Sequence, residues 1–219
     1  MKFTAAISVG LGLAGITIAA PLTARTTKLA SDNILDIAKD SRSCSSTNPE
    51  CRTNMQVGPL MVKAAAQYKL DHAAPIAAVL ALTAFETQEY QYNTNQQGSD
   101  GKPNPGQGTS NMQMYTYNLL YAQSIPALAD PLKQLGAPEV LKATTDTGLM
   151  NKVRDLLVTD EYNFGSGFWF LTTQCKADVI QQLKDNADAG FAAYMACVGV
   201  TVTDERQGYW TKAKNSFGL

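Results

Sequence analysis

Glu86 is the residue whose type and position point most clearly to chemistry. It follows the run Ile76–Phe85, in which every residue except Thr83 is apolar or small. Pro75 suits the first position of a helix, so the pattern predicts a helix from Ile76 to about Tyr90. Apolar surroundings and the negative end of a helix both disfavour an ionised carboxyl, so we expect a raised pKa for Glu86. A carboxyl that stays protonated near neutral pH is what a general acid for glycoside cleavage requires, although a simply solvated Glu remains the alternative.

A polar loop follows this helix. Residues 93–110 contain no apolar aliphatic or aromatic side chain apart from proline, and 12 of these 18 residues are Asn, Gln, Gly or Pro. Loops of this length in compact domains are usually functional, so we expect the loop to line a cleft; a surface loop without a role is the alternative. Asp100 is its only acid, and it is our candidate for the water-activating base that most glycosidases need. Asp100 could equally form a turn with Gly101. Glu89 is a weaker candidate, because we expect it on the same helix as Glu86 and pointing outward.

Three parts of the sequence resemble the lysozyme-like superfamily, in particular goose-type lysozymes, soluble lytic transglycosylases and lysozyme-like chitinases and chitosanases. They are Ala84–Glu86 together with Gly108–Tyr115, then Phe164–Cys175, and finally Arg206–Ala213. In these families an apolar helix ends in the acid Glu, and a Gly-x-Met-Gln-like segment lines the sugar cleft. Thr87 stands where transglycosylases usually have Ser, so the superfamily is a better match than any member family. The resemblance also implies that, if no second carboxylate is required, the substrate's own N-acetyl group assists the reaction.

Aromatic and amide side chains flank the polar loop. Sugar rings stack on aromatic faces, and sugar hydroxyl groups need amide donors and acceptors. The predicted substrate-binding residues are therefore Tyr90, Tyr92, Asn111, Gln113 and Tyr115. Trp169 could lie either in the core or in the cleft, whereas we expect Trp210 in the core.

The cysteines predict disulfides. An even number of cysteines in an exported chain is typical of two bridges; here they are Cys44, Cys51, Cys175 and Cys197. Three pairings are possible, and we favour Cys44–Cys51 with Cys175–Cys197, because the first pair encloses a tight polar loop. His72 is the single histidine, so clustered-His zinc sites and Ser-His-Asp or Cys-His machinery would all depend on one imidazole. We expect no metal and no organic cofactor.

The N-terminus has the pattern of a secretory signal peptide. Met1 and Lys2 precede an apolar stretch that extends to Ala20 and ends in small residues. Cleavage after Ala19 is favoured, because Pro21 disfavours the next bond; a membrane anchor is the weaker interpretation. We thus predict a signal peptide over 1–19, an N-terminal extension with a short helix and a disulfide loop over 20–55, and a catalytic domain over 56–219. The predicted location is secreted and extracellular.

Most of the chain has the hydrophobic spacing of helices. The predicted helices span Ser31–Lys39, Leu60–Tyr68, Ile76–Tyr90, Met112–Gln123, Gly148–Val158, Asp160–Thr172, Lys176–Cys197 and Asp204–Lys214. The alternation typical of strands occurs only at Tyr90–Thr94 and Gly199–Thr203. The predicted fold class is therefore mainly α: a lysozyme-like α domain with at most a small β element beside the active-site loop.

The composition limits the classes of partner that the chain is expected to bind. The 219 residues are 45% hydrophobic, with 18 Lys and Arg against 19 Asp and Glu, so the chain lacks the basic excess of a nucleic-acid-binding protein. No segment after the N-terminus is a membrane span, and we expect no membrane partner once the signal peptide is removed. We predict a monomeric secreted glycoside hydrolase with a polysaccharide substrate, a β-1,4-linked amino-sugar polymer. Mild acidity favours chitosan or chitin over peptidoglycan. The alternative is a non-catalytic secreted carbohydrate-binding or effector protein on the same scaffold.

Overall fold

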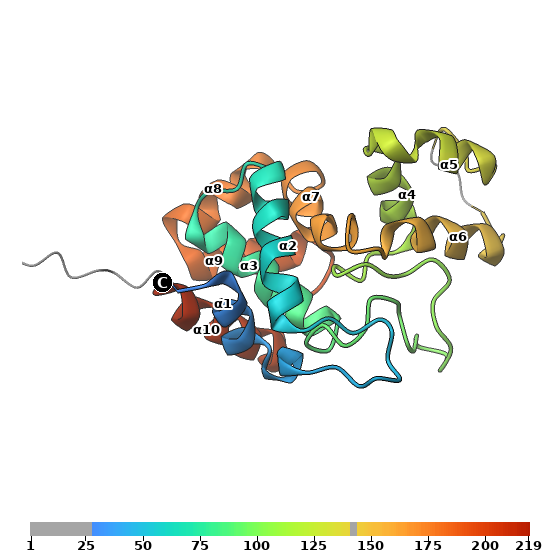
Figure 1. The fold of residues 1–219 in the computed structure, drawn as a ribbon. Helices are drawn as coiled ribbons and strands as arrows, with labels where there is room; N and C mark the ends of the chain where they lie inside the picture. The colour runs from blue at the N-terminus through green and yellow to red at the C-terminus, as the bar shows by residue number, and fades with distance from the viewer. Residues whose placement is uncertain (1–27, 141–143) are drawn as a thin grey trace, which may run out of the picture.

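The computed structural model describes residues 28–140 and 144–219, so the predicted signal peptide lies outside the described residues. The described chain is mainly helical, which confirms the predicted fold class (Figure 1). Its α-helices are α1 (Ala30–Ile37), α2 (Asn54–Gln67), α3 (Ala73–Glu86), α4 (Tyr115–Gln123), α5 (Ala129–Gln134), α6 (Thr147–Leu157), α7 (Ser166–Thr173), α8 (Ala177–Asp185), α9 (Ala187–Cys197) and α10 (Asp204–Phe217). Short 3-10 turns lie at Lys39–Arg42, Pro126–Leu128 and Asn163–Gly165.

In the part of the chain that the structure describes, β structure occurs only in the polar loop and directly after it. Isolated bridges pair Thr94 with Gly108 and Gly108 with Gln113. They confirm the small β element that was expected beside this loop. The other strand candidate, residues 199–203, is irregular.

The helices form two lobes around two hydrophobic cores (Figure 1). Helices α1, α2, α3, α8, α9 and α10 surround the first core, and α4, α5 and α6 surround the second. Helix α7 is apolar around its whole circumference and therefore contributes to both. Phe168 and Leu171 lie in the first core, whereas Trp169 and Phe170 lie in the second. This settles the two possibilities for Trp169 in favour of the core.

Helix α10 packs along α3 in the first lobe. Its Trp210 is fully buried and stacks on Phe191, with ring centroids 4.6 Å apart. The indole N–H of Trp210 donates a hydrogen bond to Asp188 Oδ1 over 2.7 Å. Trp210 therefore anchors the core, as predicted.

Two helix boundaries differ from the predictions because of capping residues. Helix α2 begins six residues before the predicted Leu60, since Gln56 Oε1 accepts the backbone N–H of Thr53 over 2.9 Å in a capping box. The predicted helix over 176–197 is two helices, because Asn186 caps α9 by accepting the backbone N–H of Ala189 over 3.1 Å.

The N-terminal segment packs into the first lobe. Ile34 and Ile37 of α1 are buried in the same core as α2 and α3. The predicted division of the chain at residue 55 stays a prediction.

Both favoured disulfides are present. Cys44 is bonded to Cys51, and Cys175 is bonded to Cys197. The second bridge ties the segment after α7 to the end of α9. Within residues 28–140 and 144–219, no helix has both the length and the apolar character needed to cross a membrane.

Candidate functional site

Helix α3 ends at Glu86, earlier than the expected Tyr90. Residues 88–90 have φ angles of 50°, 61° and 66°, which is the left-handed region that side-chain-bearing residues rarely adopt. Thr87 supports this turn: its hydroxyl donates to the carbonyl of Thr83 over 2.6 Å and accepts the N–H of Tyr90 over 2.8 Å. The chain therefore reverses directly after Glu86.

Two adjoining pockets meet at Glu86, and together they form what we call the Glu86 cleft. One has a volume of about 320 Å³ and the other about 420 Å³. Glu86, Gln107 and Met112 line both. The first pocket extends to α4, α7 and α10, and the second extends along the polar loop. The other lining residues are Leu82, Gln88, Tyr92, Thr94, Asn95, Gln96, Gln97, Gly98, Asn111, Gln113, Met114, Tyr117, Phe170, Val198, Val200 and Arg206. The predicted loop does line a cleft.

Glu86 is paired with Arg206 of α10. Arg206 Nη2 donates to Glu86 Oε1 over 3.1 Å, and the guanidinium lies over the ring of Phe85 at 4.4 Å. The two side chains are only 22% and 15% exposed. Burial raises the pKa of Glu86, whereas the hydrogen bond and charge of Arg206 lower it, and burial dominates. The predicted direction of the shift is confirmed. Glu86 therefore holds its proton to a higher pH than an exposed glutamate does.

Amide groups at the cleft have unused hydrogen-bonding capacity. Asn111 Nδ2 donates to Gln113 Oε1 over 3.3 Å. Among the described residues, Asn111 Oδ1, Gln113 Nε2 and Arg206 Nε are buried without a hydrogen-bond partner. Each such group costs about 1–3 kcal/mol. The wall of the cleft therefore carries two donors and one acceptor that the described residues leave unpaired.

Three of the five predicted substrate-binding residues line this cleft: Tyr92, Asn111 and Gln113. Tyr90 lies in the first core instead, where its hydroxyl is 3.2 Å from that of Thr83. Tyr115 is buried in the second core. The left-handed turn and the start of α4 turn these two rings inward, so the structure does not bring them to the cleft.

Neither of the two acids considered as partners of Glu86 lines the cleft. Asp100 is exposed, and its Oδ1 accepts the backbone N–H of Lys102 over 3.0 Å. This geometry matches the turn alternative, and Asp100 does not line the Glu86 cleft. Glu89 was expected to point outward from the helix, which is wrong: it lies beyond α3 and is 8% exposed.

Two residues that shape the cleft, Arg206 and Glu50, were not among the site residues predicted from the sequence, although Arg206 begins one of the segments that resemble the lysozyme-like superfamily. Arg206 reaches Glu86 across 120 positions of the chain. Glu50 holds the start of the polar loop: its carboxylate accepts the N–H groups of Asn93 and Thr94 over 2.8 and 2.9 Å, and the hydroxyl of Thr94 over 2.8 Å. Both roles depend on tertiary packing, so spacing alone could not reveal them.

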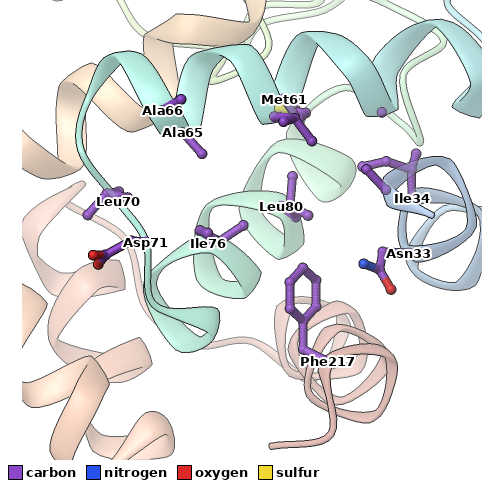
Figure 2. A pocket seen from close by; sticks show the side chains of 13 residues that line it. Asn33, Ile34, Met61, Ala65, Ala66, Leu70, Asp71, Ile76, Leu80 and Phe217 are labelled. Carbon is purple, nitrogen blue, oxygen red and sulfur yellow. The ribbon is translucent and has the colours of Figure 1, made fainter. Parts of the chain in front are cut away.

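A second, apolar pocket lies on the other face of α3. Its volume is about 370 Å³, and it is lined by residues of α1, α2, α3 and the end of α10 (Figure 2). Leu80 lines this apolar pocket, whereas Leu82 lines the Glu86 cleft. Residues two apart point to opposite sides of a helix, so α3 separates the two pockets.

Comparison with known proteins gives one match. No family model matches the chain, and no solved structure matches it. A protein of Fusarium oxysporum (strain Fo5176), named bifunctional dioxygenase (DOX)-epoxy alcohol synthase (EAS), is 45% identical over 165 residues. These residues are 75% of this chain and 12% of the relative. The chain therefore spans only a small part of the relative's length.

This relative contradicts the predicted function. It is named as a dioxygenase and synthase, so the prediction of a glycoside hydrolase, with its glycosidase class and its role in polysaccharide degradation, is corrected. The error has a physical source. A protonated carboxyl does not by itself imply glycoside cleavage, because a raised pKa suits any step that moves a proton and also occurs in structural ion pairs. The position of Glu86 at the end of an apolar helix and the direction of its pKa shift were predicted correctly, whereas the glycosidase role assigned to it was not.

Proposed function

We propose that this chain is a binding domain that holds an extended, uncharged polar ligand in the Glu86 cleft. The observation that carries the proposal is the lining of the cleft. Among the described residues that line it, the only charged ones are Glu86 and Arg206, which are paired with each other, and the other polar side chains carry amides and hydroxyls. Amides offer both donors and acceptors, which suits a ligand that carries hydroxyl and amide groups. The polysaccharide partner expected from the sequence has this chemistry.

The position of Glu86 also supports the proposed kinship with the lysozyme-like superfamily. As in that superfamily, a buried apolar helix ends in Glu at a cleft. When protonated, Glu86 can donate a hydrogen bond to a ligand oxygen. Arg206 can donate one whether Glu86 is protonated or ionised. We also propose an extracellular location, since two disulfides persist best in an oxidising compartment.

In the relative, we propose, the matched segment is a binding module beside the oxygenating part. Enzymes that use molecular oxygen do so through haem, flavin, copper or non-haem iron, and the metals are held by His, Cys or carboxylate ligands. In this chain His72 is exposed at the N-terminus of α3, and all four cysteines are in disulfides. No group of three or more His, Cys, Asp or Glu in the described ranges is placed to hold a metal ion. The described residues therefore do not fit a copper or non-haem iron centre held by three protein ligands, and we derive no oxidation step.

The apolar pocket favours a second candidate function, the binding of an apolar, oxygen-bearing molecule. The relative is named for an epoxy alcohol, which carries a hydroxyl and an epoxide oxygen. Apolar side chains of α2 and α3 face each other across the pocket, and Asn33 lies at one end (Figure 2). Asn33 Oδ1 already accepts the Ser216 hydroxyl over 3.0 Å. Its amide nitrogen is the donor that would meet a ligand oxygen.

Titration of the purified chain, followed by amide NMR shifts, tests both functions. Neutral N-acetylated amino-sugar oligomers should shift the resonances of the polar loop and of α10, and their affinity should rise with length. Gln113→Met removes one amide and keeps the size, so it should weaken binding up to about tenfold, equivalent to one hydrogen bond. The matched control is Gln181→Met, at an exposed position of α8, and it should bind normally.

Two outcomes oppose the main proposal. If Gln113→Met and Gln181→Met bound the oligomers with equal affinity, binding would not take place in the Glu86 cleft. If no oligomer of any length shifted an amide resonance, the proposed ligand would be refuted. Shifts confined to α1, α2 and the end of α10 on addition of an epoxy alcohol would instead support the second candidate function.

A further inference from the structure

Glu89 is a buried carboxylate with partners from two distant parts of the chain. Its Oε2 accepts the backbone N–H of Asp40 over 2.6 Å, and its Oε1 accepts the hydroxyl of Tyr209 over 2.9 Å. The ammonium group of Lys212 lies 3.6 Å from the same Oε1. Taking a carboxylate out of water is costly unless such bonds replace the lost hydration. These partners therefore hold Glu89 in one position.

The contacts of Glu89 are geometrically coupled to those of Glu86. Arg206 and Tyr209 are three residues apart on α10, so they lie on the same face of that helix. Arg206 bonds to Glu86, and Tyr209 bonds to Glu89. The ring of Phe85 lies between these pairs, with Arg206 over its face and Tyr209 at 5.9 Å in an edge-on arrangement. A rotation of α10 that breaks one pair would move the other.

We infer that Glu89 is a positioning residue of the Glu86 cleft: by holding Tyr209 it fixes the rotation of α10 and thereby keeps Arg206 on Glu86. The inference rests on the proposed function, in which Glu86 is the group that the ligand meets. The turn that carries Glu89 supports it. A left-handed residue with a side chain costs about 1–2 kcal/mol, and here three occur in succession. Such strain persists where surrounding bonds over-determine the conformation, and the bonds of Glu89 do this.

The groups that face Glu86 determine in which direction its pKa should move if the contact with Arg206 is lost. Arg206 from α10 favours the ionised form of Glu86 and so lowers its pKa against the effect of burial. Tyr194 from α9 is also close, since the charge of Glu86 adds to burial in raising the pKa of Tyr194. Loss of the Arg206 contact should therefore raise the pKa of Glu86. Glu89 follows Glu86 by three residues and carries a charge of the same sign, so by electrostatics alone its loss would lower that pKa.

The test is a ¹³C NMR titration of the Glu86 carboxyl in the ligand-free chain. Arg206→Gln should raise its midpoint, because the compensating charge is gone. Tyr209→Phe removes only the hydroxyl that bonds to Glu89, and it should shift the midpoint upward as well. Glu89→Gln should also shift it upward, which is opposite to the effect of charge removal alone. Lys214→Met is the control: it removes a charge from α10 that is paired with Asp188, and it should leave the midpoint unchanged.

An unchanged or lower midpoint in Tyr209→Phe would overturn the inference, and so would an unchanged midpoint in Arg206→Gln. Tyr209→Phe keeps the aromatic ring in place, so it gives an answer even if Glu89→Gln does not fold. The titration needs no ligand. Failure of this inference is therefore distinct from failure of the proposed function, which the ligand titration measures.

Discussion

Gly190→Ala should destabilise the chain by forcing α8 and α9 apart. A Cβ atom at residue 190 would lie 2.3 Å from both the backbone N and the Cα of Leu183. Carbon atoms in contact normally lie about 3.5–4.0 Å apart, so the helices would have to separate by about 1 Å or more. The clashing atoms belong to the backbone, and no side-chain rotation can relieve them.

The magnitude follows from two opposing effects. Overpacking of this kind costs about 1–3 kcal/mol, and the greater helix preference of Ala over Gly returns about 0.5–1 kcal/mol. Because the clashing atoms belong to the backbone, we take about 2–3 kcal/mol for overpacking; subtracting about 1 kcal/mol for helix preference leaves a net loss of about 1–2 kcal/mol in the free energy of unfolding. For a chain of this size that corresponds to a fall in Tm of about 2–8 °C.

Gly208→Ala is the matched control. Gly208 lies within α10, away from its ends, and is exposed to solvent, so an added Cβ atom would meet no other group within 4 Å. This change should raise the free energy of unfolding by about 0.5–1 kcal/mol. Urea denaturation and thermal unfolding of the two variants measure both effects. If Gly190→Ala proved as stable as Gly208→Ala, the close contact between α8 and α9 would be refuted.

Three further predictions concern charge, disulfides and the loop. Burial raises the pKa of Glu86 in the folded state. The free energy of unfolding of the wild type, relative to that of Glu86→Gln, should therefore be greatest below the unfolded pKa of Glu and should fall as the pH rises through the folded pKa. If urea unfolding showed that this difference grows with pH, the prediction would be contradicted. Removing the Cys175–Cys197 disulfide, whose ends are 22 residues apart, should cost about 3.4 kcal/mol, against about 2.4 kcal/mol for the bridge that spans 7 residues, and calorimetry of the two double variants should show this order. Asp100→Asn should change the free energy of unfolding by less than about 0.5 kcal/mol and leave ligand affinity unaltered; weaker binding at unchanged stability would restore Asp100 as a site residue.

Local patterns in the sequence predicted much of the fold. The apolar run before Glu86 located α3 and its exit toward a cleft, and the short polar loop between Cys44 and Cys51 indicated the correct disulfide pairing. The predicted end of α3 was wrong, because residues 88–90 adopt a left-handed conformation although none of them is a glycine. The turn depends on bonds to Thr83 and Asp40, of which the second is distant in sequence.

The site was only partly predictable for the same reason. Asn111 and Gln113 lie next to the loop that forms the cleft, so their type and position sufficed to find them. Arg206 meets Glu86 only because α10 packs along α3, and the inward turn of Tyr90 follows from the left-handed turn. Hydrophobic spacing fixes which helices form, but it does not state which faces of two helices meet.

The two ends of the described chain lie side by side. Lys28 Nζ donates to the hydroxyl of Ser216 over 3.0 Å, where α1 begins and α10 ends (Figure 1). Neither end lines the Glu86 cleft. A short linker could therefore join residue 219 to residue 28 and close the chain into a ring, which could be reopened in an exposed loop as a circular permutant. By the same geometry, a host protein that offers two neighbouring attachment points could carry this domain as an insertion, with the cleft left open to its ligand.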